Sequence, residues 1–178
     1  MGRAVPPGWQ EFARQVGGEV VKARFFRPDT VVVKRDPWTI TLDTRIESGG
    51  SPDFGATTTH IYTRLTARYV NRDGFQFSIR PTDEFSRLGK ALGIRFEVGD
   101  PDLDRRYLMK SNDEAKLRTL FANPRFSHLF RDVKYKLNLK VKGSNELCLE
   151  VPTRVTDPEE LKSLLDLFAE TLTQLSAA

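Results

Sequence analysis

Apolar residues recur at every second position in several stretches of the chain, the spacing typical of β-strands with one buried face. The clearest alternation runs through residues 135–151, interrupted once by Gly143-Ser144-Asn145. The two apolar faces coincide only if Val141 lies opposite Leu147, because a slip of one residue would expose a whole row of apolar side chains. The pattern therefore predicts a hairpin with a three-residue turn, in which Asn145 takes the left-handed conformation.

Two further hairpins are predicted upstream. The strand pattern over 30–46 is broken by Asp36-Pro37, which predicts a turn because proline fixes φ and has no amide hydrogen. Residues 57–70 are rich in β-branched and aromatic residues, and Asp73-Gly74 is a strong turn dipeptide before the alternating residues 75–79. We therefore expect strand 57–70 to pair with strand 75–79. Between the two hairpins, Gly, Ser and Pro predict a flexible loop over 47–56.

Helical spacing of apolar residues marks both ends of the chain. Residues 9–16 form a short amphipathic pattern, and Gly17-Gly18 ends it. Asp157-Pro158 combines an N-cap with proline at the first helical position, and leucines then follow one stripe as far as Leu175. We expect this long C-terminal helix to cover one face of the sheet.

The central part of the chain contains weaker helical patterns. One helix is predicted over 84–92, and another is predicted to follow Ser111 and Glu114, which have the spacing of a capping box. Together these elements predict an α+β fold with a largely antiparallel, curved sheet built from hairpins and covered by helices. A single domain over 1–178 is expected, with a two-lobed organisation left open.

Composition narrows the class of protein. The chain has 178 residues, 39% of them hydrophobic and 29% charged, which is enough apolar material for one core. No stretch is apolar enough for a membrane span or a secretory signal, so the expected location is the cytoplasm. The single cysteine, Cys148, lies in a strand pattern, and a buried structural thiol is expected there.

Candidate catalytic and metal-binding residues are few. His60, His128 and Cys148 are dispersed along the chain, and no motif joins either histidine to a nucleophile. Glycine-rich phosphate-binding motifs are absent from the sequence. We therefore predict no catalytic residue, no metal site and no cofactor, and we favour a protein that is not an enzyme.

The segment 99–107, with three aspartates and two arginines, is the most distinctive. The alternating aspartates resemble the opening of a calcium-binding loop, but Arg105 stands where that loop needs glycine, and Ser111 where it needs glutamate. A structural turn is the preferred interpretation, with aspartates bound to backbone amides, arginines balancing their charge and Leu103 in the core. The residues of this predicted turn are Asp100, Asp102, Leu103, Asp104, Arg105 and Arg106.

Three stretches together resemble a family of uncharacterised bacterial proteins. They are residues 38–43, residues 62–65 with the strands that follow, and the segment 99–106 with Lys110 to Asp113. The family pattern has an aromatic residue or leucine at the position of Leu103, where an aromatic residue is usual. The resemblance implies a shared fold over about residues 9–175 and no particular activity, so no catalytic residue is carried over.

The charge pattern offers one possible surface for an anionic partner. The formal net charge is +4, from 28 basic and 24 acidic residues. Four lysines near the C-terminal hairpin were expected to share one strand face, although no aromatic residue lies between them and Glu146 and Glu150 lie opposite. A solvated sheet face is therefore favoured, and nucleic acid is an unlikely partner. The residues are Lys134, Lys136, Lys140 and Lys142.

Three functions remain open from the sequence. The first is a non-enzymatic binding or interaction module whose partner, possibly a protein, is unknown. The second is a protein that binds a small apolar or lipid-like ligand, or an enzyme, with a pocket between the sheet and the C-terminal helix. The aromatic residues proposed to line that pocket are Tyr62, Tyr69, Phe75 and Phe77. The third is weak nucleic-acid binding through the lysine-bearing strand.

Overall fold

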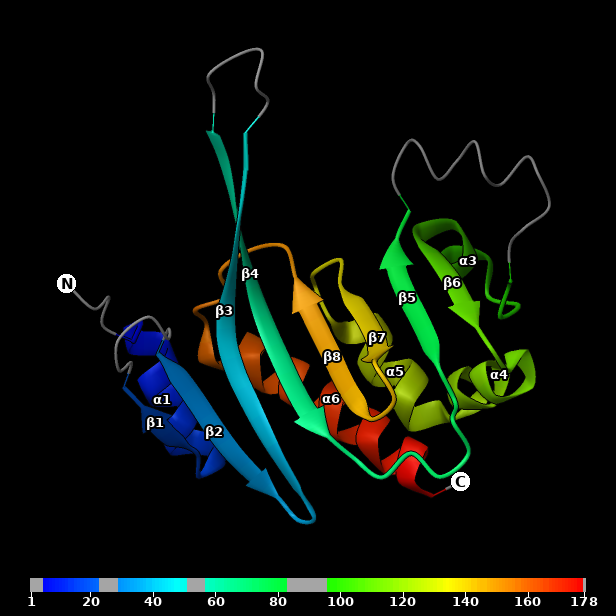
Figure 1. Ribbon diagram of the computed structural model, residues 1–178, viewed down its shortest axis with the longest axis horizontal. Helices are drawn as coiled ribbons and strands as arrows, with labels where there is room; N and C mark the ends of the chain where they lie inside the picture. The colour runs from blue at the N-terminus through cyan, green and yellow to red at the C-terminus, as the bar shows by residue number, and fades with distance from the viewer. Residues whose placement is uncertain (1–4, 23–28, 51–56, 83–95, 178) are drawn as a thin grey trace.

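The computed structural model describes residues 5–22, 29–50, 57–82 and 96–177, in which eight antiparallel strands form one open sheet (Figure 1). The strand order is β1-β2-β3-β4-β8-β7-β5-β6. The predicted α+β class with a largely antiparallel sheet is confirmed. The strands are β1 (Glu19–Val21), β2 (Thr30–Arg35), β3 (Trp38–Gly50), β4 (Thr57–Arg68), β5 (Phe77–Pro81), β6 (Tyr107–Ser111), β7 (Asn138–Lys142) and β8 (Glu146–Val151).

Helices cover one face of this sheet. In the view of Figure 1, α1, α5 and α6 lie behind the strands, and the face toward the viewer carries none of the described helices. The long C-terminal helix is confirmed, with the Asp157 carboxylate accepting hydrogen bonds from the amides of Glu159 and Glu160. The helices are α1 (Pro7–Val16), α3 (Pro101–Arg106), α4 (Glu114–Ala122), α5 (Pro124–Asp132) and α6 (Pro158–Ser176).

Two of the predicted hairpins are confirmed in their pairing. Strands β2 and β3 are joined through Asp36-Pro37, and strands β7 and β8 place Val141 opposite Leu147. The left-handed residue found in the second turn is Gly143, with a φ of 61°, two positions before the expected Asn145. Glycine adopts this conformation without the steric cost that a side chain would add.

The predicted pairing of β4 with β5 is wrong. Strand β4 pairs with β3 and β8, while β5 pairs with β7 and β6, so the β7–β8 hairpin lies between them. An alternating pattern specifies which face of a strand is buried, but it does not specify which strand lies beside it in the sheet. The sequence pattern therefore predicted the wrong partner for β4. Gly74 does take a left-handed φ of 68°, in a loop instead of a tight hairpin turn.

The predicted flexible loop over 47–56 is wrong for residues 47–50, which belong to a strand. Strand β3 continues to Gly50, with Glu47 opposite His60 and Gly49 opposite Thr58. Its backbone pairing with β4 therefore extends beyond the residues in which apolar side chains alternate. Residues 51–56 lie outside the described residues, as does the whole of the predicted helix 84–92. Strands β3 and β4 consequently form a twisted two-stranded arm that extends past the rest of the sheet (Figure 1).

Several helix boundaries also differ from expectation. The N-cap of α4 is Asp113, which accepts a hydrogen bond from the Lys116 amide at 3.0 Å, while Ser111 ends strand β6. The expected turn at 100–106 contains the short helix α3, because Asp100 and Pro101 form a helix start. Helix α5 was not predicted, although Asn123 and Pro124 supply the same kind of signal.

The core lies between the sheet and the helices. Helix α1 is joined to the segment after β8 by a hydrogen bond of 2.8 Å from the Trp9 indole to the carbonyl of Val155. Val155 in turn donates its amide to the Thr63 hydroxyl at 2.8 Å, so this segment is tied to both layers. The largest fully buried side chains include Trp9, Phe12, Phe126, Phe168, Ile40, Leu42, Leu65 and Ile79.

Candidate functional site

The face of the sheet without helix cover carries mostly polar side chains. On β4, Leu65 and Ala67 are buried toward the helices, so Arg64 and Thr66 between them point to the opposite face. The same alternation of buried and more exposed residues is found in β2, β5 and β6. We call this surface the uncovered face, and the term refers to the described part of the chain.

A charged row crosses the centre of the uncovered face. Arg64 lies opposite Asp43 on β3 and opposite Glu150 on β8. Its guanidinium donates two hydrogen bonds to the Asp43 carboxylate, from Nε at 2.8 Å and from Nη2 at 2.7 Å. These bonds raise the pKa of Arg64, although partial burial acts against them. These two parallel hydrogen bonds fix the orientation of the Arg64 and Asp43 side chains relative to each other on the uncovered face.

The Glu150 carboxylate is almost fully buried although it lies on this face. Its residue is 5% exposed, and Arg45 Nε is 2.6 Å from Oε1, while Lys140 Nζ is 3.8 Å from Oε2. Arg45 also pairs with Glu47, and its guanidinium lies 4.2 Å from the centre of the Tyr62 ring. The acidic groups at the centre of the face are therefore neutralised by neighbours within it.

Positive charge remains after this pairing. Five exposed basic side chains on the uncovered face have no ion pair within the part of the chain that the structure describes. They lie on β2, β4, β5, β6 and β7, so they are spread across the sheet and not gathered on one strand. The five are Lys34, Arg68, Arg80, Lys110 and Lys142.

The four lysines singled out from the sequence are divided between two places. Lys140 and Lys142 lie on β7 and contribute to the uncovered face. Lys134 precedes that strand and pairs with Glu160 of α6 at 3.2 Å, beside a cavity of about 260 Å³ with several acidic residues in its lining. Lys136 is exposed between them, also before β7. The structure therefore does not bring all four together on one strand face.

The aspartates of the segment 99–107 bind its own backbone. Asp100 accepts hydrogen bonds from the amides of Asp102 and Leu103, and Asp104 accepts from those of Val98 and Gly99. These bonds occupy carboxylate oxygens that a metal ion would need.

The side chains of this segment have different surroundings. Leu103 is 3% exposed and lies in the core, whereas Asp102 and Arg105 are 3.7 Å apart at the surface. Asp100 pairs with Arg131 of α5, an arginine that sequence reasoning did not identify. Arg106 lies 5.8 Å from the ring centre of Tyr107. The arrangement is that of a structural element at the start of α3.

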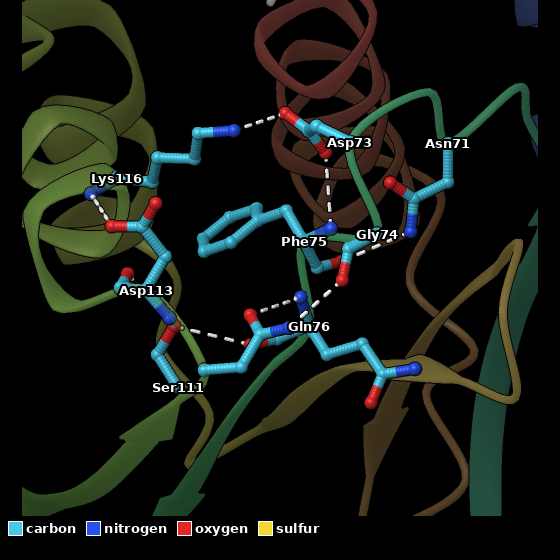
Figure 2. A network of polar contacts seen from close by, with 9 residues as sticks. Asn71, Asp73, Gly74, Phe75, Gln76, Ser111, Asp113 and Lys116 are labelled. Atoms are coloured by element: carbon cyan, nitrogen blue, oxygen red, sulfur yellow. Dashed lines mark hydrogen bonds and ion pairs between the residues drawn. The ribbon is translucent and has the colours of Figure 1, made fainter.

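A small cavity lies beside the loop between β4 and β5. Figure 2 shows the polar contacts that shape this loop, including the Asp73 carboxylate, which accepts from the Phe75 amide at 3.0 Å and pairs with Lys116. The Lys116 contact lowers the pKa of Asp73. Asn71 donates to the carbonyls of Phe75 at 3.0 Å and Ser144 at 2.9 Å. The loop is thereby joined to α4 and to the β7–β8 turn.

The size of this cavity limits what it can accept. Its volume is about 110 Å³, and Phe75, Leu120 and Leu175 form its apolar side. Ligand pockets usually have about 300–1,000 Å³, so the space suits a single side chain better than a cofactor. Both charged groups at its edge, Asp73 and Lys116, already neutralise each other.

The four aromatic residues proposed for an apolar pocket do not converge. Tyr69, Phe75 and Phe77 are buried in the core, with Phe75 and Phe77 ring centres 5.4 Å apart. Tyr62 instead lies beside Arg45 on the uncovered face. The Tyr69 hydroxyl is buried and has no hydrogen-bond partner in the described part of the chain, and this burial raises its pKa to about 12.

The groups with catalytic potential also remain apart. His60 lies opposite Glu47 on the arm, and His128 pairs with Asp132 at 3.1 Å on the exposed side of α5. Burial raises the pKa of Cys148 to about 11, which keeps its thiol protonated at neutral pH. Among the described residues, no group of three or more His, Cys, Asp or Glu side chains is placed to hold a metal ion. None of the helices that the structure describes has the length and apolar character needed to span a membrane.

Comparison with known proteins yields a likeness of fold. No protein-family model matches the chain, and no curated protein matches it significantly. A solved structure, the mycobacterial trehalose monomycolate transport factor A, TtfA, superposes with a TM-score of 0.56 at 7% sequence identity. The alignment covers 93% of this chain and 91% of that one. At this identity the likeness concerns the arrangement of the backbone alone.

Proposed function

We propose that the protein is a non-enzymatic binding module whose partner is an acidic protein surface held against the uncovered face of the sheet. The observation that carries the proposal is the charge balance of this face. Asp43 and Glu150 form ion pairs within it, while five exposed basic side chains have no ion pair among the described residues, although Glu146 lies opposite two of them, Arg68 and Lys142. A surface of this kind complements a partner with negative charge.

The breadth of the face favours a protein over a small ligand. In the order of the sheet it runs from β2 to β6, and its positive groups are spread over five strands, with adjacent strands about 4.8 Å apart. A small anion would contact only one or two of these groups. A folded protein surface can contact several of them at once, which supports a macromolecular partner.

The side chains of the face favour acidic protein over nucleic acid. Single-stranded nucleic acids bind through bases stacked on free aromatic rings, and Tyr62 on this face is already covered by the Arg45 guanidinium. Duplex binding depends on dense positive charge along phosphate rows, whereas Glu146 lies between Arg68 and Lys142 in the sheet. A mixed surface of this kind suits carboxylates spaced irregularly on a protein.

The proposal also includes the cellular location of the protein. We place it in the cytoplasm of a bacterium, on the resemblance of its motifs to those of uncharacterised bacterial proteins and on a single cysteine that is buried and free. The chain is proposed to act as one domain. The fold it shares with a transport factor is compatible with a role that involves no catalysis.

The proposal is tested with the whole chain and a fluorescent polyglutamate peptide as probe. Lys110→Glu combined with Lys142→Glu reverses two free charges of the face, and we expect the dissociation constant measured by fluorescence anisotropy to rise at least tenfold. The matched control, Arg154→Glu with Lys162→Glu, makes the same change of net charge at exposed positions away from the face. Equal weakening by both pairs would reduce the effect to net charge and contradict the proposal.

The same assay distinguishes the partner class. A fluorescent single-stranded RNA of equal charge, measured at the same ionic strength, is expected to bind more weakly than polyglutamate. Tighter binding of the RNA, lost in the Lys110→Glu, Lys142→Glu variant, would replace the acidic protein by nucleic acid as the partner.

A further inference from the structure

The arm of β3 and β4 has outer edges without neighbouring strands among the described residues. Pairing of β3 with β2 ends at Leu42, opposite Val31, and pairing of β4 with β8 ends at Thr63, opposite Val151. Beyond these points, in the ranges that the structure describes, β3 and β4 pair only with each other, as far as Gly50 and Thr57. Figure 1 shows this arm extending past the remaining strands. The arm thus presents sheet edges to which another strand can be added.

The ladder determines which backbone groups point outward on β4. The Thr63 amide donates to the carbonyl of Thr153 at 3.0 Å, on the side away from β3. In an antiparallel sheet, the N–H and C=O groups of one residue point to the same side, and those of the next residue to the other. Thr59 and Ile61 therefore direct their backbone groups to the free edge, whereas His60 directs its groups to β3.

This edge lacks the features that protect most sheet edges. Natural edge strands are commonly short, bulged or interrupted by lysine or proline. The segment 57–62 reads Thr-Thr-Thr-His-Ile-Tyr, so four of its six residues are β-branched and none is lysine or proline, and its register with β3 is continuous. By contrast, edge strand β1 has only three residues, and a bridge from Phe96 adjoins edge strand β6 at Met109.

We propose that two copies of the chain pair through this edge of β4, antiparallel and with Thr59 on the two-fold axis. In that register Thr59 faces Thr59 of the second copy and Ile61 faces Thr57, so outward backbone groups meet outward backbone groups. A two-fold axis makes the contact isologous, so each copy contributes the same segment and the pairing of Ile61 with Thr57 occurs twice. Because the arm projects from the body, the two bodies lie at opposite ends of the shared strands.

The first experiment measures mass in solution by light scattering over a range of protein concentrations. We expect the wild-type chain to move from 20.3 kDa toward twice that mass as concentration rises. Thr59→Pro removes only an outward N–H, leaves the bonds to β3 intact, and is expected to raise the dimer dissociation constant at least tenfold. The control Thr59→Val keeps the amide and should dimerise like the wild type.

The second experiment tests the register by oxidative cross-linking. Thr59→Cys places two thiols on the axis, where Cα atoms of a hydrogen-bonded pair are about 5.5 Å apart, within the range of a disulfide. Thr58→Cys places them two residues out of register, beyond about 7 Å, and should not cross-link. The native Cys148 is 3% exposed and is present in every variant, so the wild-type chain measures any cross-linking that does not involve the introduced cysteine.

Each result of these two experiments either supports or overturns the proposed pairing. A concentration-dependent dimer that Thr59→Pro weakens and Thr59→Cys traps would support the pairing. A wild-type chain that stays monomeric, a dimer that Thr59→Pro leaves unchanged, or equal cross-linking at both positions would overturn it. Binding to polyglutamate through Lys110 and Lys142 is a separate property, and neither result depends on the other.

Discussion

Gly8 lies in the first turn of α1, at a point where the helix touches the chain segment after β8. A Cβ atom built on Gly8 would lie 1.7 Å from the carbonyl oxygen of Thr156 and 2.8 Å from its carbonyl carbon. Both atoms belong to the backbone, so no side-chain rotation relieves the overlap. We predict that Gly8→Ala destabilises the protein, although alanine is the better residue for a helix.

The magnitude follows from what must move. The segment containing Thr156 is held by Val155, which bonds to Thr63 and to the Trp9 indole, each at 2.8 Å. Helix α1 would have to shift by more than 1 Å, which displaces Trp9 from the core, where it is 1% exposed. Overpacking costs about 1–3 kcal/mol, and this severe contact lies at the upper end. The higher helix propensity of alanine stabilises the helix by about 1 kcal/mol. We therefore expect the free energy of unfolding to fall by about 2 kcal/mol overall.

Urea denaturation followed by circular dichroism measures this loss as a change in the free energy of unfolding. The control is Gln10→Ala, an exposed position in the same helix, where we expect a change within about 0.5 kcal/mol. The reasoning would be refuted if Gly8→Ala were as stable as the wild type or more stable, since helix propensity would then outweigh the contact.

Three further predictions concern single side chains. Leu103→Ala should cost about 2–4 kcal/mol in urea denaturation because it empties a core position that is 3% exposed; an unchanged midpoint would contradict its packing role. For Asp100, burial opposes ionisation, but backbone amides and Arg131 outweigh it and lower the pKa. The ionised form therefore adds stability above the unfolded pKa of about 3.9, and this is lost as pH falls through the folded pKa. Asp100→Asn should thus be less stable than wild type at pH 7, with a difference that disappears in acid; a pH-independent difference would exclude the charge effect. Cys148 should react slowly with a thiol reagent at neutral pH and rapidly in urea, because burial raises its pKa to about 11; fast native labelling would disprove its protection.

The parts of the fold that the sequence predicted correctly depend on local signals. The helix start at Asp157-Pro158 needs only a capping side chain and a fixed φ, and the register of Val141 with Leu147 needs only two alternating faces joined by a short turn. Both are set by residues close together in the chain. Such signals survive folding because the partners meet through short loops.

The errors concern partners that are distant in the chain. Alternation in 57–68 is satisfied equally by β5 or β8, and nothing within the strand distinguishes Leu149 from Ile79 as the neighbour of Leu65. The ion pairs of the uncovered face were missed for the same reason, because Arg45 and Glu150 meet only after the three strands β3, β4 and β8 are in order. Asn123 and Pro124, by contrast, form a local helix-start signal, so the start of α5 could have been predicted from the sequence.

The position of the β7–β8 hairpin has a consequence for the order in which the molecule can be assembled. The ribosome delivers β1–β4 and then β5–β6 well before residues 138–151, yet these residues join the two groups in the sheet. Until they emerge, β4 has an open inner edge along Thr63–Arg68, and β5 lacks one neighbour. A nascent or truncated chain that ends before β7 therefore holds two incomplete sheets with apolar faces exposed, the kind of species that chaperones bind.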